Sequence, residues 1–186
     1  METKKRCAWC EKDDLYRDYH DNEWGNPVYD DATLFEFLLL ETFQAGLSWY
    51  TILAKRQHFA KAFDRFDYQK IARYDEAKIQ ELMQDAGIIR NQLKIRGTVS
   101  NAKAFMEVQK EFGSFSKYIW GFVDGKPIVN HHQSMGTVPA TTPLSDAISK
   151  DLKKRGFKFV GSTVVYAHMQ ATGMVDDHMA DCWKRN

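Results

Sequence analysis

Hydrophobic residues along this chain recur mainly at three- and four-residue spacing, the period of an α-helix with one buried face. The pattern predicts a helix that begins at Asp31 and includes Glu41, and further helices over 49–63, 67–73, 75–86, 92–110, 143–155 and 163–172. Residues 112–141 are rich in glycine and proline instead, so we expect loops there and a short extended pair. The predicted fold class is therefore mainly α.

The segment 7–29 lacks a clear period but is dense in aromatic rings. We expect it to be irregular, with turns or caps at 13–14 and 21–22, and to pack on the helical body.

Residues 75–110 predict two helices joined by a tight turn, a helix–hairpin–helix. Gly87 ends the first helix and Asn91 caps the second. The buried face of the second helix is expected to hold Leu93, Ile95, Val99, Ala102, Phe105 and Met106. Free N–H groups at such a turn can bind a DNA phosphate, and Gly87, Ile88 and Arg90 are the predicted contacts. A plain helical hairpin explains the same pattern equally well.

A single carboxylate, Glu41, lies in the apolar stretch 38–49. An ionised carboxylate buried without a partner is costly, so Glu41 either joins a structural network or awaits a ligand. A glutamate that reaches solvent from the helix face is the ordinary alternative. Trp49 would share this face if one helix continued that far. An acid and a ring on one pocket suit a flat, nitrogen-rich, cationic ligand.

Five rings are candidates for the same pocket, although each alone is more typical of a core. They are Trp9, Tyr16, Tyr19, Trp24 and Trp49. Together with Glu41 they could enclose a nucleobase flipped out of duplex DNA. Leu47, next to Gly46, is suited to fill the gap left in the base stack.

Composition and charge indicate the number of domains and the cellular location that we expect. At 186 residues with a net charge of +1, the chain predicts one domain over 1–186. The charge balance argues against a polybasic mode of nucleic-acid binding but leaves a local DNA-binding face open. No apolar run approaches the length of a membrane span, and the N-terminal residues 1–6 are polar, unlike a signal peptide. We expect a cytoplasmic protein, monomeric and without an obligate protein partner.

Three cysteines, an odd number, indicate metal ligation or free thiols. His178 and Cys182 are four residues apart and would share one face of a helix. Cys7 and Cys10 have CxxC spacing, and His20 lies nearby. These residues predict a structural zinc site that joins the two ends of the chain, with Cys10 and His20 competing for one position.

Several blocks of the sequence resemble one known family, the 3-methyladenine DNA glycosylase I family of the helix–hairpin–helix superfamily. The blocks run in order over nearly the whole chain: Cys7-x-Trp9, Asp14-Leu15-Tyr16, Tyr19-His20-Asp21-x-Glu23-Trp24-Gly25, Gln44-Ala45-Gly46-Leu47-Ser48-Trp49, Asp85-Ala86-Gly87-Ile88-Ile89-Arg90 and Lys153-Lys154-Arg155-Gly156-Phe157-Lys158-Phe159-Val160-Gly161.

The resemblance implies a monofunctional enzyme that flips 3-methyladenine out of alkylated double-stranded DNA and hydrolyses its N-glycosidic bond, leaving an abasic site. Glu41 matches the acid that recognises the base, our candidate catalytic residue, and the five rings match the family's pocket. Gly46 and Leu47 match the residues that enter the base stack. Cys7, His20, His178 and Cys182 match the structural zinc ligands, which favours His20 over Cys10.

The chain departs from the wider superfamily in one respect. The usual catalytic aspartate has no clear counterpart, since Glu107 and Glu111 lie in the right region without a matching motif. Lys94 is the nearest lysine to the hairpin and is poorly placed for a Schiff base, so strand cleavage is not expected. The alternative function is a non-enzymatic, zinc-stapled DNA-binding module, and a pocket for a free purine-like metabolite is a third.

Overall fold

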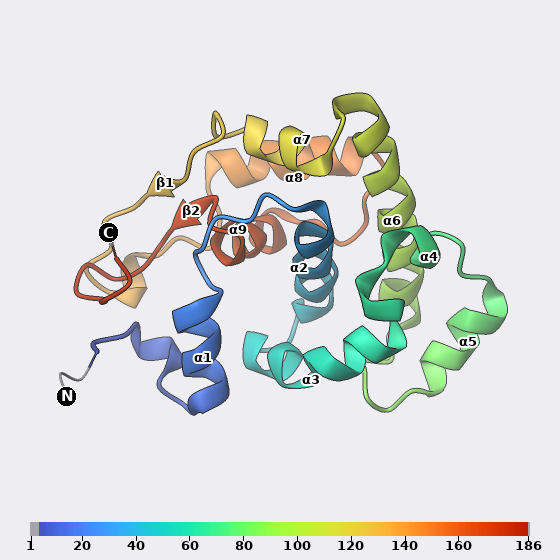
Figure 1. Ribbon diagram of the computed structural model, residues 1–186, viewed down its shortest axis with the longest axis horizontal. Helices are drawn as coiled ribbons and strands as arrows, with labels where there is room; N and C mark the ends of the chain where they lie inside the picture. The colour runs from blue at the N-terminus through green and yellow to red at the C-terminus, as the bar shows by residue number, and fades with distance from the viewer. Residues whose placement is uncertain (1–3, 186) are drawn as a thin grey trace.

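The computed structural model describes residues 4–185, so residues 1–3 of the polar N-terminal segment and residue 186 lie outside it. Within the described residues the prediction of a mainly α fold is confirmed (Figure 1). The helices are α1 (Asp14–Asn22), α2 (Asp31–Gln44), α3 (Trp49–Ala62), α4 (Tyr68–Ile71), α5 (Glu76–Gln84), α6 (Gln92–Phe112), α7 (Phe115–Gly121), α8 (Pro143–Lys154) and α9 (Ser162–Ala171). Two short strands, β1 (Ile128–Val129) and β2 (Val175–Asp176), and three 3-10 turns, η1 (Ala8–Cys10), η2 (Asp64–Phe66) and η3 (Met135–Thr137), complete the chain.

Helix α2 lies at the centre of the molecule, with α3, α6 and α9 around it (Figure 1). It is apolar almost all round, and a helix of that kind must be covered on every side. Its residues from Phe37 to Phe43 are all buried. The Asp31 carboxylate accepts hydrogen bonds from the backbone N–H of Phe115 and Ser116 at 2.9 and 2.8 Å, which fixes the start of α7 against α2.

The prediction of an irregular segment over 7–29 was wrong, because residues 14–22 form α1. Asp13 caps this helix through its side chain, which accepts from the N–H of Tyr16 at 3.0 Å. Tyr19 and His20 are buried on its inner face. A nine-residue helix spans too few turns for its period to stand out, and the aromatic residues around it blur the pattern further.

Helix α2 ends at Gln44 and α3 begins at Trp49 after the Ser48 cap, in agreement with the predicted helix over 49–63, so Glu41 and Trp49 do not share one continuous helix. Three further details differ from the predictions. The segment 112–141 contains α7, and its strand β1 pairs in parallel with the distant β2 instead of with a neighbour. Leu93, predicted in the core, is 70% exposed. The segment that carries His178 and Cys182 is not helical.

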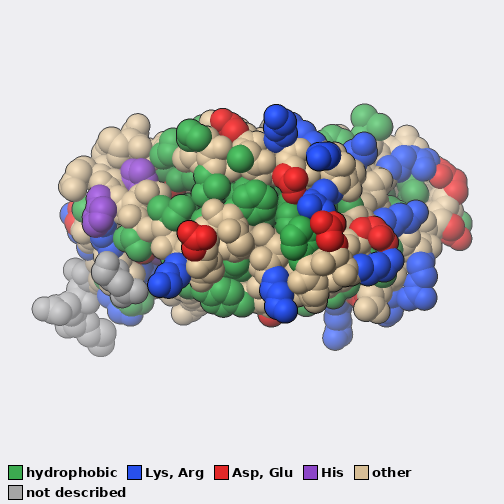
Figure 2. Space-filling model, turned by 90° about the horizontal axis from the view of Figure 1, so that it is seen from above, with side chains coloured by type: hydrophobic (Ala, Val, Ile, Leu, Met, Phe, Trp, Pro, Cys, Tyr) green, Lys and Arg blue, Asp and Glu red, His purple; other side chains and the backbone are tan. Residues whose placement is uncertain are grey.

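Charges on the surface lie close to opposite charges. Figure 2 views the molecule from the side of α7 and shows acidic and basic side chains beside one another on this face. Arg155 is one example, since it contacts both Asp151 and Glu111 at 2.7 Å. In residues 4–185 no helix combines the length and the apolar character required to span a bilayer.

Gly173 provides a test of how tightly the end of α9 is packed. Its φ is +70°, and an added Cβ would lie 2.4 Å from the backbone carbon of Asn26. We expect Gly173→Ala to lower the free energy of unfolding by roughly 3 kcal/mol or more, because the substitution adds a backbone clash to the left-handed strain.

Gly125→Ala is the matched control, since Gly125 has a φ of +73° with open space around it. It should cost only about 1 kcal/mol. Urea unfolding of both variants measures the difference, and equal losses would contradict the packing described.

Candidate functional site

A cavity of about 200 Å³ opens between α1, α2, α3 and α9. The structure places all six residues predicted for a pocket on its wall, although they come from η1, α1, the turn after α1, α2 and α3. The lining residues are Trp9, Tyr16, Tyr19, Trp24, Glu41, Gln44, Trp49, Met135, Val138, Ala167, Gln170 and Asp177. The cavity is therefore largely aromatic, with a few polar groups.

The rings of the cavity support one another. Trp9 contacts Tyr16 and Trp24 edge to face, with centroid distances of 4.9 and 5.0 Å. Tyr19 and Trp49 lie 5.5 Å apart. Such edge and tilted contacts hold rings in fixed orientations. The indole Nε1 of Trp49 is buried and has no hydrogen-bond partner among the described residues, so it is a free donor near the cavity.

Glu41 lies at the cavity on the inner face of α2 and is 4% exposed. Its carboxyl group makes no hydrogen bond or ion pair with residues 4–185. Burial alone raises the pKa of Glu41 to about 8, since nothing nearby stabilises the anion. The site therefore favours a ligand that brings positive charge or N–H donors to this carboxylate.

Half of the cavity wall was not predicted from the sequence. Gln44, Met135, Val138, Ala167, Gln170 and Asp177 also line it. Met135 begins η3 and Val138 follows it, in a segment without periodicity, and Ala167 and Gln170 line the cavity from α9. The position of Asp177 directly before His178, a candidate metal ligand, was the one sequence feature that could have identified it. Its hydrogen-bond partners are distant in the sequence and could not be predicted from it.

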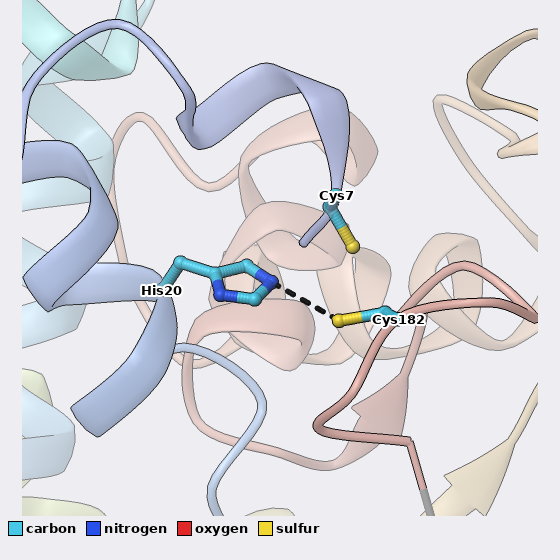
Figure 3. Close-up of side chains that lie close together, drawn as sticks. All are labelled: Cys7, His20 and Cys182. Carbon is cyan, nitrogen blue, oxygen red and sulfur yellow. Dashed lines mark hydrogen bonds between the residues drawn. The ribbon is translucent and has the colours of Figure 1, made fainter. Parts of the chain in front are cut away.

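Three of the predicted metal ligands meet at one buried point. The ligand atoms of Cys7, His20 and Cys182 all lie within 4.8 Å of one another (Figure 3). Nε2 of His20 is 3.4 Å from Sγ of Cys182. The residues come from the N-terminal segment, α1 and the C-terminal segment, so a metal ion here would join both ends of the chain.

His178, the fourth predicted ligand, lies next to this group. Its ring centroid is 5.2 Å from that of His20, and its Nε2 is buried without a partner in the described part of the chain. Nδ1 of His178 contacts Asp176 at 2.7 Å, and Nδ1 of His20 contacts Asp21 at 2.8 Å. Metal-bound histidines are usually oriented by such carboxylates, so these residues fit a metal ion.

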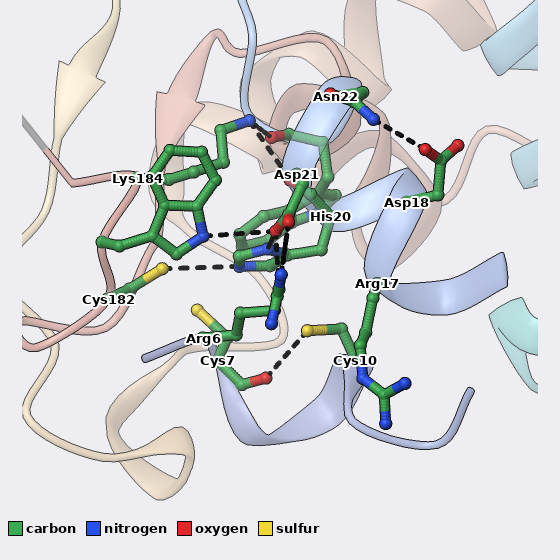
Figure 4. A network of polar contacts seen from close by, with 12 residues as sticks. Arg6, Cys7, Cys10, Arg17, Asp18, His20, Asp21, Asn22, Cys182 and Lys184 are labelled. Atoms are coloured by element: carbon green, nitrogen blue, oxygen red, sulfur yellow. Dashed lines mark hydrogen bonds and ion pairs between the residues drawn. The ribbon is translucent and has the colours of Figure 1, made fainter. Parts of the chain in front are cut away.

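Cys10 faces a different partner. Its thiol donates to the carbonyl oxygen of Cys7 at 3.1 Å and lies outside the group of three (Figure 4). Arg6 holds Asp21 from the other side, with its Nη2 2.8 Å from the carboxylate (Figure 4). The polar contacts around the cluster therefore support His20 as the ligand, and Cys10 as a neighbour.

The loop between α2 and α3 presents Gly46, with a φ of +81°, and Leu47, which is 37% exposed. Lys94 of α6 fixes the base of this loop, because its Nζ donates to the carbonyl oxygens of Phe43 and Ala45 at 3.0 and 2.9 Å. Lys94 is buried by this packing and does not line the cavity, so it is poorly placed for covalent chemistry there.

The hairpin between α5 and α6 differs in detail from the predicted phosphate site. The N–H of Gly87 donates to the side chain of Asp85 at 2.7 Å, and Ile88 is buried, so both residues build the turn. Arg90 is exposed. The N–H groups without helical partners are those in the first turn of α6, as at any helix start.

The chain was compared with known protein families and solved structures. The family model described as methyladenine glycosylase matches residues 9–185. The chain belongs to this family. A DNA-3-methyladenine glycosylase of Haemophilus influenzae is 49% identical over 177 residues, which cover 95% of this chain and 96% of the relative.

Solved structures of 3-methyladenine DNA glycosylase I have the same fold. One crystal structure has a TM-score of 0.95 at 46% identity, covering 98% of this chain and all of its own. A variant crystallised in complex with 3-methyladenine has a TM-score of 0.94 at 36% identity, covering 97% of each chain. The family places this chain among glycosylases, enzymes that hydrolyse N-glycosyl bonds.

Neither acid considered in place of the superfamily aspartate lies at the cavity of this methyladenine glycosylase. Glu107 pairs with Lys110 and Glu111 with Arg155, and both glutamates are largely exposed. Glu41 is thus the acidic residue of the cavity whose carboxyl group makes no hydrogen bond or ion pair within the described part of the chain.

The buried Glu41 predicts an unusual pH dependence of stability. Its pKa is about 8 in the folded state, against an ordinary value of 4.5. Between these values the folded protein holds a proton that the unfolded chain has released, so this residue destabilises the fold progressively as pH rises from about 4.5 to 8. Glu41→Gln should be more stable than wild type at pH 8 by roughly 1–3 kcal/mol.

The gain of Glu41→Gln should shrink towards pH 5, as measured by urea unfolding at both values. Glu107→Gln, an exposed change, is the control and should follow the wild-type pH dependence. If the curves of wild type and Glu41→Gln were parallel, the carboxylate would not be desolvated as described.

Proposed function

We propose that this chain is a monofunctional DNA glycosylase that excises 3-methyladenine from alkylated double-stranded DNA. The observation that carries the proposal is the buried, unpartnered carboxylate of Glu41 on a cavity walled by five aromatic rings. Such a cavity suits a flat base with positive charge. A DNA-binding module without catalysis would leave it without a role.

Methylation at N3 supplies the charge that the cavity lacks. While it is attached to the sugar, 3-methyladenine is a cation, and its positive charge favours the ionised form of Glu41. We infer that Glu41 accepts a hydrogen bond from the amino edge of the base. The rings of Trp9, Tyr16, Tyr19, Trp24 and Trp49 enclose the base, with cation–π attraction of about 0.5–2 kcal/mol.

The cationic base is already a good leaving group, so no strong general acid is required. The bond between the sugar C1′ and N9 breaks, and N9 keeps its electron pair, which neutralises the base. The sugar becomes oxocarbenium-like, and a water oxygen bonds to C1′ and loses a proton. An abasic site results. Lys94 does not line the cavity, and its Nζ donates to two backbone carbonyl oxygens, which supports simple hydrolysis without strand cleavage.

DNA binding is assigned to two features, the loop between α2 and α3 and the hairpin between α5 and α6. The exposed Leu47, next to Gly46, would fill the gap left by the flipped nucleotide. The hairpin would bind backbone phosphate through the first turn of α6 and Arg90, with Gly87 and Ile88 shaping the turn. Neither contact reads sequence, as expected for a protein that finds damage in any context.

We propose further that zinc is held by Cys7, His20, His178 and Cys182. Two thiolates and two imidazoles are a usual tetrahedral zinc set, and the unpartnered Nε2 of His178 supports the fourth position. When bound, the ion supplies a fixed cross-link and no catalysis. Its ligands lie next to η1 and α1, so the cross-link would position Trp9, Tyr16 and Tyr19 at the cavity.

Methylated duplex DNA tests the proposed activity. Wild-type protein should release 3-methyladenine and leave 7-methylguanine in place, as resolved by chromatography of the free bases. Glu41→Gln should slow the release roughly 10- to 100-fold, the effect of losing a hydrogen bond to a charged group. Glu107→Gln should retain wild-type activity. Full activity of Glu41→Gln would refute the role of the carboxylate, and no release by folded wild type would refute the enzyme.

The zinc assignment is tested with a matched pair of variants. His178→Ala should reduce zinc affinity at least tenfold, since losing even an outer partner of a ligand costs 10- to 100-fold. Cys10→Ala should keep one zinc per chain, because its thiol faces the Cys7 carbonyl. Metal analysis after dialysis against a weak chelator gives the stoichiometry. The melting temperature should fall for His178→Ala, and equal zinc content in both variants would contradict the ligand set.

A further inference from the structure

Besides Gln44, two polar residues on the cavity wall have no part in the function proposed above, and they are hydrogen-bonded to each other. They are Gln170, near the end of α9, and Asp177, directly after β2. Asp177 is 1% exposed, yet its carboxylate accepts four hydrogen bonds. The donors are Asn130 Nδ2 at 2.7 Å, His132 Nε2 at 2.9 Å, Tyr166 Oη at 2.6 Å and Gln170 Nε2 at 2.8 Å.

The carboxylate of Asp177 is therefore fully occupied by the protein. Each of its oxygens accepts two of the four bonds, which uses the lone pairs available to it. Asp177 has little capacity left for a ligand. Its effect on the cavity must come through the side chains that it orients.

Gln170 is the one of these side chains that also lines the cavity. An ionised carboxylate only accepts, so the amide nitrogen of Gln170 must face Asp177. The amide oxygen is then the free end. Within residues 4–185 it has no hydrogen-bond partner, and it is not sealed in the core. The backbone is held as well, since the N–H of Gly25 donates to the Gln170 carbonyl oxygen at 3.1 Å.

Gln44, the other glutamine on the wall, is held differently. Its amide nitrogen donates to the carbonyl oxygen of Leu47 at 2.7 Å, inside the exposed loop between α2 and α3. That hydrogen bond is local in the sequence and exposed, whereas Gln170 is fixed by the buried carboxylate of Asp177. Gln170 is therefore the better preorganised neutral acceptor.

We propose that Gln170 is a specificity-determining residue whose amide oxygen accepts one N–H of the exocyclic amino group of the bound base, while Glu41 accepts the other. This inference rests on the proposed function. An exocyclic amino group carries two N–H donors, and the carboxylate of Glu41 and the preorganised amide oxygen of Gln170 are the acceptors that we assign to them. A base with a carbonyl oxygen at this position would place acceptor against acceptor and be disfavoured.

Binding of free bases, followed by tryptophan fluorescence, tests the proposal without DNA. The probes are 3-methyladenine and 3-methylpurine, which has the same ring but no amino group. Wild type should bind 3-methyladenine more tightly. Gln170→Met keeps the size of the side chain but removes the acceptor, so it should reduce this preference roughly five- to tenfold, the effect of one neutral hydrogen bond. Its binding of 3-methylpurine should be unchanged.

Tyr166→Phe is the matched control, because it removes one donor to Asp177 and leaves Gln170 in place. It should keep the wild-type preference even if it lowers stability. Equal weakening of both bases by Gln170→Met, or no change for either, would overturn the proposal. If wild type bound neither base, the proposed base-binding role of the cavity itself would fail, which is a distinct result.

Discussion

The carboxylate of Glu41 is buried on the most enclosed helix of the molecule, and the rest of the site depends on that placement. Helix α2 is covered by α3, α6 and α9, so the carboxylate cannot move to solvent to regain hydration. The fold therefore leaves the Glu41 carboxyl group without a partner, and desolvation favours its protonated form. Under the proposed function, a cationic base stabilises the ionised form that burial disfavours, and this favours the methylated base over a neutral purine of the same shape.

Much of the helical framework could be predicted because its signals are local. The Asp30, Asn91 and Thr142 caps and the apolar stripes that follow them fix α2, α6 and α8 within a few residues of the chain. The aromatic residues and Glu41 could be assigned to one cavity from their chemistry and the family resemblance. Helix α1 could not be predicted in this way, because its amphipathic stretch is short and the helix is stabilised by the aromatic rings that pack on it.

The unpredicted parts of the site depend on contacts between residues far apart in the chain. Asp177 meets Asn130 and His132 across 47 and 45 positions, a relation that no local period encodes. The metal cluster joins His20 to Cys182 across 162 positions. Residue types identified its members, but spacing suggested a helix for His178 and Cys182 that the structure lacks. The choice between Cys10 and His20 likewise rests on which side chain the fold directs inward.

The two carbonyl contacts of Lys94 link parts of the surface that would otherwise be independent. Lys94 lies in the first turn of α6, and its Nζ donates to two carbonyl oxygens where α2 ends and the loop of Leu47 begins. Under the proposed function, the spacing between the phosphate bound at the hairpin and the inserted Leu47 is therefore set before DNA binds. A duplex that bends or opens easily can conform to this spacing, whereas a stiff, intact one must be deformed. The protein would then test the mechanical weakness of each base pair before the cavity tests its chemistry.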